Sequence, residues 1–317
     1  LLELRAGTDD VSVVGALASL GFSIEGAPTD RQPPSEHARM LLHRSLLSWP
    51  GTRLEAALPD DMVEWLDSGS SSLGDRIAAA LQRRYDLAWD RTTDCFRLYD
   101  DETDVTVDLY GADLVWSAYT DLPSDRDPGD ALPRLLAAEA ARATAIAQQL
   151  GARTAWLKLR PRQANTIVDA LRAGLVPTAP IFGDRTQPRE GVVIRENGVR
   201  YWAHLGAGLS TGLFLDQRDN RRWVQSLAAG KRVLNTFAYT CGFSVAAAVG
   251  GARRTVSIDA ARPALEQGRA NLALNGFDDP EQHDTIRGDV FNWIPRLARR
   301  GDRFDIVILD PPSYSKV

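Results

Sequence analysis

A regular alternation of short apolar runs and amphipathic stretches over residues 231–310 constrains the fold more than any other feature of the sequence. The stretches between the runs place apolar residues at helical spacing. The runs themselves are short and rich in β-branched residues: KRVLNTFAY (231–239), RTVSIDA (254–260), DTIRGDV (284–290) and FDIVILD (304–310). Such a series predicts an α/β fold with an open parallel sheet, in which ligands bind at the carboxyl ends of the strands.

Acidic residues end three of these four predicted strands. Asp259 ends the second strand, Asp289 the third and Asp310 the fourth, where two prolines follow. Because the carboxyl ends of parallel strands meet at one edge of a sheet, we expect these acids to share that edge. An acid at the position of Asp259, about 20 residues after the first turn, accepts hydrogen bonds from the ribose hydroxyls of a nucleoside cofactor.

The turn after the first strand narrows the choice of cofactor. A dinucleotide site needs G-x-G-x-x-G, so that the backbone can approach a pyrophosphate. The turn here reads AYTCGFS and contains one glycine, Gly242. This disfavours a nicotinamide dehydrogenase and leaves room for a cofactor without phosphate, such as S-adenosylmethionine.

The sequence before this part divides into two regions. Residues 1–90 are predicted to form a helical accessory region, because HARMLLHRSLLSW (37–49) and DRIAAALQRRY (75–85) have helical spacing. Residues 91–190 are predicted to form a compact α+β central domain, a candidate RNA-binding domain. Its predicted elements are the strands CFRLYD, VTVDLYG, DLVWSAYT and TAWLKLRP, a helix closed by Gly151, a loop at 123–130, a helix at 163–174 and a linker at 177–190.

A third region is predicted over 191–317. It opens with a hairpin around Asn197-Gly198, the strongest short hairpin signal. A helix should follow, with Asp216 as its cap and Asp219 favouring the positive helix start.

The composition excludes several classes of protein. The two cysteines form no CxxC and the four histidines have no metal-ligand spacing, so no metal site is predicted. No apolar run of about 18 residues occurs in the sequence. We expect a cytoplasmic protein without a signal peptide or membrane contact. The net charge of −5 argues mildly against a nucleic-acid partner. Basic residues outnumber acidic ones over 200–317, however, so this part of the chain is the better candidate for binding a polyanion.

Four stretches of the third region resemble one family. TGLFLDQRDNRRWV, RVLNTFAYTCGFSVAAAVGGA, SIDAARPALEQGRANLALNG and FDIVILDPPSY are similar, in order and spacing, to the bacterial ribosomal RNA large-subunit methyltransferases. These are class I, S-adenosylmethionine-dependent enzymes that modify carbon 5 of cytosine or nitrogen 7 of guanine in 23S rRNA. The resemblance implies a Rossmann-like class I methyltransferase sheet, S-adenosylmethionine as cofactor and 23S rRNA or a ribosomal precursor as partner. The resemblance is looser over 95–162, and it does not extend to residues 1–90.

The resemblance also implies which residues contact the cofactor. The first turn would face its methionine part, through Phe237, Tyr239, Thr240 and Gly242. Asp259 would hold the ribose, and Asp289 with Val290 would border the adenine. Asp216 and Arg218 would close over the cofactor from the preceding segment.

The implied catalytic residues lie at the end of the fourth strand. Asp310 would sit nearest the transferable methyl group, and Pro311 and Pro312 would fix the backbone beyond it. Tyr314 would stack on a base extruded from its helix. Nitrogen 7 of guanine has a lone pair of its own, whereas carbon 5 of cytosine needs a cysteine thiolate. Neither Cys241, in the cofactor turn, nor Cys95, in the central domain, is expected to be that nucleophile.

Two other functions fit the same sequence. A prolyl pair and an aromatic after the acid are also found in amino-group methyltransferases, so the substrate could be a protein or another nucleic acid. The chain could also be an inactive RNA-binding or assembly protein, although the three strand-end acids favour a competent cofactor site. A homodimer is possible, but no sequence feature supports one.

The resemblance carries an expectation about the C-terminal end. The family's sheet has seven strands and this sequence supplies the first four, so we expect further sequence after Val317. A chain ending there would leave an apolar strand edge exposed, and should bind the cofactor poorly and aggregate.

Overall fold

The computed structural model describes residues 72–84, 87, 91–101, 104–121, 131–162, 174–184 and 191–311, together with the backbone of two short strands before them. The chain divides into two compact units, Leu1–Ser71 and Ser72–Val317. The loop predicted at 123–130, nearly all of the helix predicted at 163–174, and Pro312 and Tyr314 lie outside the described residues. No helix within these ranges is long and apolar enough to cross a membrane.

The first unit contains a β-hairpin where the sequence predicted the end of a helix. Strand β1 (Leu46–Trp49) pairs antiparallel with β2 (Thr52–Glu55), and Trp49 is opposite Thr52. The helical prediction for 37–49 is therefore wrong over its last four residues. The sequence between the strands is Pro-Gly, and a residue before proline is pushed away from the helical conformation.

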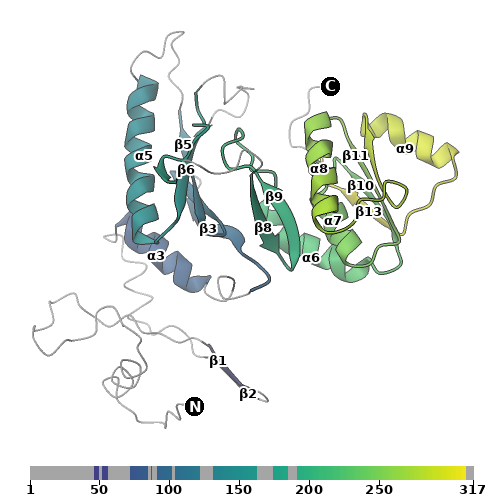
Figure 1. Cartoon of the computed structure of the whole chain (residues 1–317), viewed down its shortest axis with the longest axis horizontal. Helices are drawn as coiled ribbons and strands as arrows, with labels where there is room; N and C mark the ends of the chain where they lie inside the picture. The colour runs from purple at the N-terminus through teal and green to yellow at the C-terminus, as the bar shows by residue number, and fades with distance from the viewer. Residues whose placement is uncertain are drawn as a thin grey trace, which may run out of the picture. The chain divides into compact units, whose positions relative to one another are not determined.

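A five-stranded sheet forms the central domain of the second unit (Figure 1). Its strands, in spatial order, are β3 (Cys95–Asp101), β4 (Val105–Tyr110), β5 (Asp113–Thr120), β6 (Thr154–Pro161) and β7 (Phe182–Gly183). Strands β5 and β6 are parallel because the helix α5 (Ala131–Gln149) connects them, and the other pairs are antiparallel. All four predicted strands and the helix before Gly151 are confirmed. The predicted linker at 177–190 is corrected, since part of it adds β7 to the sheet.

The central sheet is covered on both faces, and β5 and β6 are each buried over six successive residues. On one face Leu114 and Trp116 pack with α5 and with α3 (Leu73–Arg83). On the other face Val115 packs with residues from beyond 191. Helix α3 thus shares the core of the central domain. The division of the chain into two compact units falls at 71/72, before this helix.

The C-terminal sheet has the parallel topology that the alternation predicted. Strands β10 (Arg232–Thr236), β11 (Arg254–Asp259), β12 (His283–Arg287) and β13 (Ile306–Leu309) lie in the order β12-β11-β10-β13, and all pairs are parallel. Helices α7 (Gly242–Val249), α8 (Arg262–Leu274) and α9 (Val290–Arg299) connect them in sequence. The strand order reverses between β10 and β13, which creates a switch point at their carboxyl ends.

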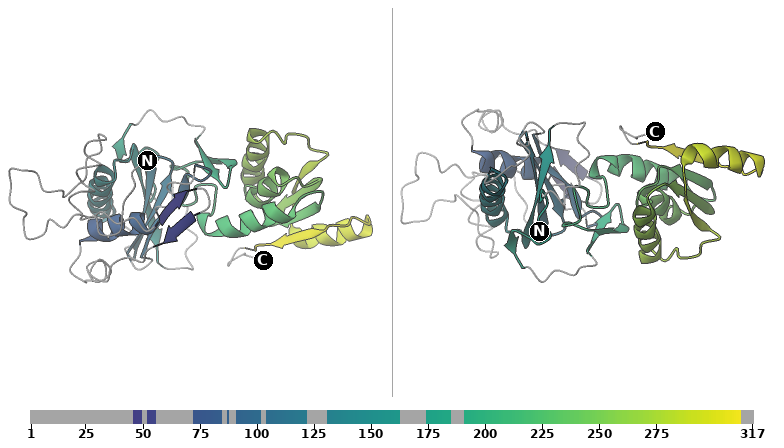
Figure 2. Two further views of the ribbon diagram at one scale, coloured as in Figure 1. Left: turned by 90° about the horizontal axis from the view of Figure 1, so that it is seen from below. Right: turned by 90° about the horizontal axis from the view of Figure 1, so that it is seen from above.

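Helices cover both faces of this sheet, as the alternation of side chains along β10 requires (Figure 2). Val233 packs with α7 and with α6 (Arg218–Leu227). Its neighbour Leu234 points to the opposite face and packs with α9. The architecture is a doubly wound α/β sheet, as predicted.

A hairpin and a short turn connect the two sheets. Strands β8 (Val192–Glu196) and β9 (Val199–Ala203) pair across Asn197 and Gly198, whose φ angles of 51° and 80° confirm the predicted tight turn. A 3-10 turn, η1 (Leu215–Gln217), then leads into α6. The prediction that Asp216 caps this helix is wrong, because α6 begins after Gln217 without a side-chain cap. Asp219 does lie in the first turn, as predicted.

Candidate functional site

The turn between β10 and α7 has an unusual backbone. Phe237, Tyr239 and Cys241 all have positive φ angles, of 55°, 49° and 60°. Non-glycine residues rarely adopt this conformation, and each costs roughly 1–3 kcal/mol unless its surroundings impose it. The sequence predicted a strand as far as residue 239, but the strand ends at Thr236, and the following residues form this strained turn at the switch point.

Asp259, the last residue of β11, holds the turn in place. One carboxylate oxygen accepts a hydrogen bond from the Tyr239 backbone N–H at 2.8 Å, and the other accepts one from Ala261 N–H at 2.8 Å. The side chain is half-buried, and each oxygen keeps a second lone pair. Asp259 can therefore brace the turn and still accept hydrogen bonds from a ligand.

Two further contacts fix the turn from the other side. The Thr240 hydroxyl donates to the carbonyl of Gly212 at 2.5 Å, and the Asn271 side-chain amide donates to the Thr240 carbonyl at 3.1 Å. Gly242 begins α7, and a Cβ there would lie 3.2 Å from Leu213. The glycine thus permits a close approach between the turn and the 205–216 segment.

Asp289 lies beside Asp259 but is not the end of a strand. Strand β12 ends at Arg287, and Asp289 is the N-cap of α9, where it accepts a hydrogen bond from Phe291 N–H at 2.8 Å. The Gly288 N–H donates to the Asp259 carbonyl at 2.9 Å, which joins the two strand ends. The carboxylate of Asp289 is exposed and remains a candidate ligand group.

Val290, predicted to border the adenine, is 4% exposed and packs in the core below α9. The exposed apolar surface at this place belongs to Phe291, which is 75% exposed. Its ring meets that of Phe237 edge to face, with centroids 6.1 Å apart. Phe291 was not predicted, because the first turn of an amphipathic helix gives no sign that its apolar residue faces solvent.

The segment before α6 reaches the turn through an aromatic contact. The ring of Phe214 lies 5.4 Å from that of Tyr239, and Phe214 is 53% exposed. Asp216 is exposed and lines the same pocket as Tyr239. Arg218, in contrast, pairs with Asp219 at 3.2 Å and is half-buried. The structure thus brings Asp216 to the turn 237–241, whereas the charge of Arg218 is directed to Asp219.

A pocket of about 70 Å³ lies between the turn 237–241 and the central sheet. Besides Asp216 and Tyr239, it is lined by Arg97, Asp108 and Arg160 from the central strands. Arg97 binds Asp108 with two hydrogen bonds, whereas the Nε atom of Arg160 is buried without a hydrogen-bond partner. These three residues were not predicted, because they come from strands that lie far from the turn along the chain.

Two cations of β6 hold the loop that forms one wall of this pocket. Lys158 donates to the Gly208 carbonyl at 2.6 Å, and Arg160 donates to the Leu209 carbonyl at 2.8 Å. Lys158 is fully buried, and this burial, with a smaller contribution from Arg160, lowers the pKa of its ammonium to about 7. The central domain thereby positions the loop that contacts Thr240.

The depressed pKa of Lys158 gives a testable pH dependence. Between about pH 7 and pH 9 the unfolded chain binds a proton at Lys158 that the folded chain releases, so the free energy of unfolding should rise with pH, by roughly 2 kcal/mol over that window. Lys158→Met should remove most of this slope, as measured by urea unfolding at several pH values. Lys231→Met, at an exposed lysine, is the control and should keep it. Equal slopes in wild type and Lys158→Met would contradict the assignment.

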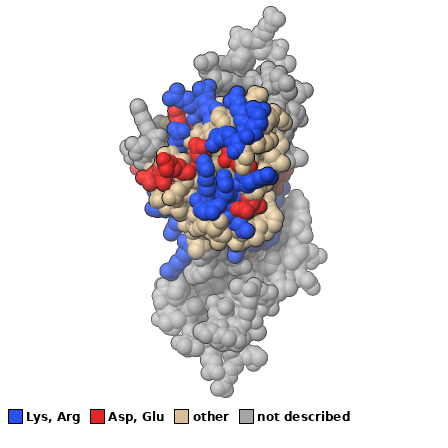
Figure 3. Space-filling view, turned by 90° about the vertical axis from the view of Figure 1, so that its right-hand side faces the viewer, with Lys and Arg blue, Asp and Glu red and all other residues tan. Residues whose placement is uncertain are grey.

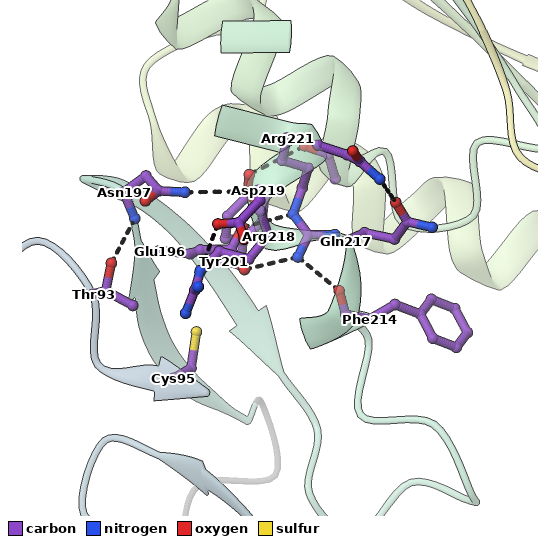
Figure 4. Close-up of polar contacts among 12 residues, drawn as sticks. Thr93, Cys95, Glu196, Asn197, Tyr201, Phe214, Gln217, Arg218, Asp219 and Arg221 are labelled. Atoms are coloured by element: carbon purple, nitrogen blue, oxygen red, sulfur yellow. Dashed lines mark hydrogen bonds and ion pairs between the residues drawn. The ribbon is translucent and has the colours of Figure 1, made fainter. Parts of the chain in front are cut away.

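A buried ion pair connects the hairpin to the start of α6 (Figure 4). The guanidinium of Arg221 donates to both carboxylate oxygens of Glu196, at 2.6 and 2.7 Å, and also to the Phe214 carbonyl at 2.7 Å. Both side chains are at most 3% exposed. Burial disfavours the charged guanidinium, but the hydrogen bonds that Arg221 donates to the Glu196 carboxylate raise the pKa of Arg221 above its ordinary value. The pair thus anchors the segment that carries Phe214 and Asp216.

Neither cysteine is suited to nucleophilic attack. Cys241 is fully buried, which raises the pKa of its thiol to about 12. Burial likewise raises the pKa of Cys95 well above its ordinary value, and its thiol lies 3.4 Å from the Arg195 carbonyl. A thiolate is the reactive form, and at neutral pH both groups are protonated. Within the described ranges, no His, Cys, Asp and Glu side chains gather as a metal-ligand set.

Asp310 and Pro311 follow β13 directly, and both are exposed. Leu309 is opposite Thr236 in the parallel pair, so Asp310 follows at the level where the strained turn begins. The Thr236 hydroxyl donates to the Ile308 carbonyl at 2.7 Å and joins the two strand ends. Asp259, Asp289 and Asp310 thus lie at the carboxyl edge, as predicted, although Asp289 caps α9 and does not end a strand.

Comparisons with known proteins agree with this geometry. The model of the S-adenosylmethionine-dependent methyltransferase family matches residues 139–317. A ribosomal RNA large subunit methyltransferase of Deinococcus radiodurans is 38% identical over 76% of this chain and 57% of its own length. The ribosomal RNA large subunit methyltransferase K/L of Pseudomonas putida is 37% identical over 79% of this chain and 32% of its own.

A solved protein structure has a similar fold. SMU.776, a protein assigned as a methyltransferase and complexed with SAH, has a TM-score of 0.61 and 29% identity, over 78% of this chain and 60% of its own. The chain spans between a third and three fifths of the length of these relatives. The family model covers more than half of the chain, including the whole C-terminal sheet and its strand-end acids. The chain therefore belongs to the S-adenosylmethionine-dependent methyltransferase family.

Proposed function

We propose that this chain provides the cofactor site and part of the substrate surface of an S-adenosylmethionine-dependent methyltransferase that modifies a base of 23S ribosomal RNA in the cytoplasm. The observation that carries the proposal is the strained turn 237–241, braced by Asp259 at the switch point of the sheet. The names of the relatives from Deinococcus radiodurans and Pseudomonas putida support the RNA substrate.

The residues at the carboxyl edge fit such a cofactor. Asp259 has lone pairs left for ribose hydroxyls, and Asp289 presents an exposed carboxylate next to it. Phe237 and Phe291 offer an apolar surface for a purine. The turn from Tyr239 to Gly242 would hold the amino-acid part. A pyrophosphate would meet larger side chains in this turn than the glycines that it requires.

When bound, the cofactor supplies an electrophilic methyl group. The residues of the chain then need only to align an electron-rich acceptor atom with it and to exclude water. Asp310 and Pro311, at the end of β13, would position the acceptor, and Pro312 and Tyr314 follow them in the sequence. A ring nitrogen needs no covalent help, whereas transfer to carbon 5 would require a thiol other than Cys95 and Cys241.

Incorporation of label from tritium-methyl S-adenosylmethionine tests the proposal. The chain is incubated separately with unmodified ribosomal RNA, with duplex DNA and with a cytoplasmic protein fraction. We expect label in the RNA, and loss of incorporation in Asp310→Asn. Arg200→Gln, at an exposed residue on β9, is a control that should keep activity. Label in protein alone would replace the RNA assignment with a protein substrate.

Calorimetric titration with S-adenosylhomocysteine separates a catalytic chain from an inactive one. Binding without turnover on any of these substrates would favour a binding or assembly role for the chain. No binding to the folded chain would contradict the assignment of the cofactor site.

A further inference from the structure

Lys and Arg side chains gather on the face of the molecule shown in Figure 3. The amino ends of the C-terminal strands, at the edge of the sheet opposite to the strand-end acids, are also flanked by basic residues. Lys231 and Arg253 directly precede β10 and β11. Arg296 and Arg299 lie in the last turn of α9, and Arg303 lies in the connection to β13. All five residues are exposed, and we call them the amino-edge patch.

Backbone and side-chain contacts make this edge continuous. The Arg253 N–H donates to the Lys231 carbonyl at 2.8 Å, and Asp305 N–H donates to the Arg232 carbonyl at 2.8 Å. Asp302 lies between Arg232 and Arg300, at 3.6 and 3.2 Å. The patch therefore belongs to three adjoining segments that are fixed to one another.

The charges of the amino-edge patch are not neutralised within the described part of the chain. Lys231, Arg253, Arg299 and Arg303 have no ion-pair partner there, and Arg296 lies over the ring of Trp293. Two acids of this edge are engaged elsewhere: Asp302 pairs with Arg232 and Arg300, and Asp305 accepts a hydrogen bond from Arg232 N–H. Basic side chains in the last turn of α9 also suit the helix dipole, but that effect does not account for Lys231 and Arg253.

The patch is separate from the methyl-transfer edge. The strands between the two edges have four to six residues, which at about 3.3 Å per residue makes a sheet roughly 15 Å high. A nucleotide at Asp310 cannot contact the patch at the same time, but another part of a long RNA can.

We infer that the amino-edge patch binds the phosphate backbone of RNA at a place remote from the methylated base, and so contributes affinity but no chemistry. The inference rests on the proposed RNA substrate. Unpaired arginines on a rigid edge suit phosphates, because a guanidinium donates to two oxygens at once. Released counterions make such binding strongly dependent on salt.

Fluorescence anisotropy with a labelled single-stranded RNA of mixed sequence tests this surface over a range of salt concentrations. The patch variant combines Arg253→Gln, Arg299→Gln and Arg303→Gln. Losing three phosphate contacts should reduce the salt slope by about 2 and weaken binding at 0.1 M salt roughly 100-fold. The control variant removes the same charge at three exposed arginines elsewhere, through Arg134→Gln, Arg200→Gln and Arg222→Gln, and should keep the wild-type slope.

Further measurements separate this inference from the proposed function. The affinity for S-adenosylhomocysteine should be equal in wild type and the patch variant. A variant that combines Arg253→Lys, Arg299→Lys and Arg303→Lys keeps the positive charges and should show the wild-type salt slope. If the wild-type chain binds no RNA, both the RNA substrate and the patch are overturned. If it binds RNA and the patch variant keeps its slope, or the control loses as much, only the patch is overturned.

Discussion

Glu196→Ala should lower the free energy of unfolding by about 3–5 kcal/mol, the largest effect that we expect from a single substitution in this chain. The substitution leaves the guanidinium of Arg221, which is 3% exposed, without its charge partner. Of the acceptors in the described part of the chain, the Phe214 carbonyl would still accept a hydrogen bond from it. Urea unfolding followed by circular dichroism measures the loss.

Two variants control for this effect. Arg262→Ala removes an ion pair with Glu266 that is exposed on both sides, and should cost less than about 1 kcal/mol. The double variant Glu196→Leu, Arg221→Met replaces the buried pair by apolar side chains, and should recover much of the stability that Glu196→Ala loses. A cost for Glu196→Ala no greater than that of Arg262→Ala would show that water reaches the buried pair.

Asp259→Ala should weaken S-adenosylhomocysteine binding by roughly 10- to 100-fold, as measured by calorimetry. Hydrogen bonds to a charged acceptor contribute about 1.5–3 kcal/mol, and about 1.4 kcal/mol corresponds to a factor of ten. The sequence suggests that such a strand-end acid serves the ligand more than the fold. The hydrogen bonds from Tyr239 and Ala261 change that expectation, and we expect a stability loss of about 1–2 kcal/mol as well.

A matched variant separates the two roles of Asp259. Asp305→Ala also removes a carboxylate that accepts a backbone hydrogen bond, from Arg232 N–H, but at the opposite edge of the same sheet. It should lose similar stability and keep its affinity for S-adenosylhomocysteine. Asp259→Asn retains one acceptor oxygen and should fall between wild type and Asp259→Ala. If Asp259→Ala kept full affinity, the ribose would have to be held elsewhere.

The sequence predicted correctly those elements in which buried apolar residues recur at the spacing of a strand or a helix. Four apolar runs separated by amphipathic helices gave the parallel sheet, and Asn197-Gly198 gave the hairpin register. The misassignments lie where local pattern is weak. Leu46–Trp49 has the spacing of a helix but precedes a proline, and β7 has only two residues inside a stretch rich in turn formers.

The site was predicted in part, for a related reason. Asp259, Asp289 and Asp310 could be found because the strands that they follow are parallel, so their ends must meet. The environments of Val290 and Arg218 could not be predicted. A residue at the start of a helix can face the core, a neighbouring side chain or a ligand, and the sequence pattern is the same in each case.

The sequence by itself determined the order of strands and helices, the family and the acids at the carboxyl edge, because these depend on patterns along the chain. Only the tertiary structure decided that Asp259 braces a strained turn, that Arg221 is paired with Glu196, and that Lys158 and Arg160 hold the loop beside Thr240. These contacts join residues 20 to 50 positions apart. These contacts stabilise the fold through burial and through well-aligned hydrogen bonds. Both depend on tertiary packing, so neither can be read from the sequence pattern.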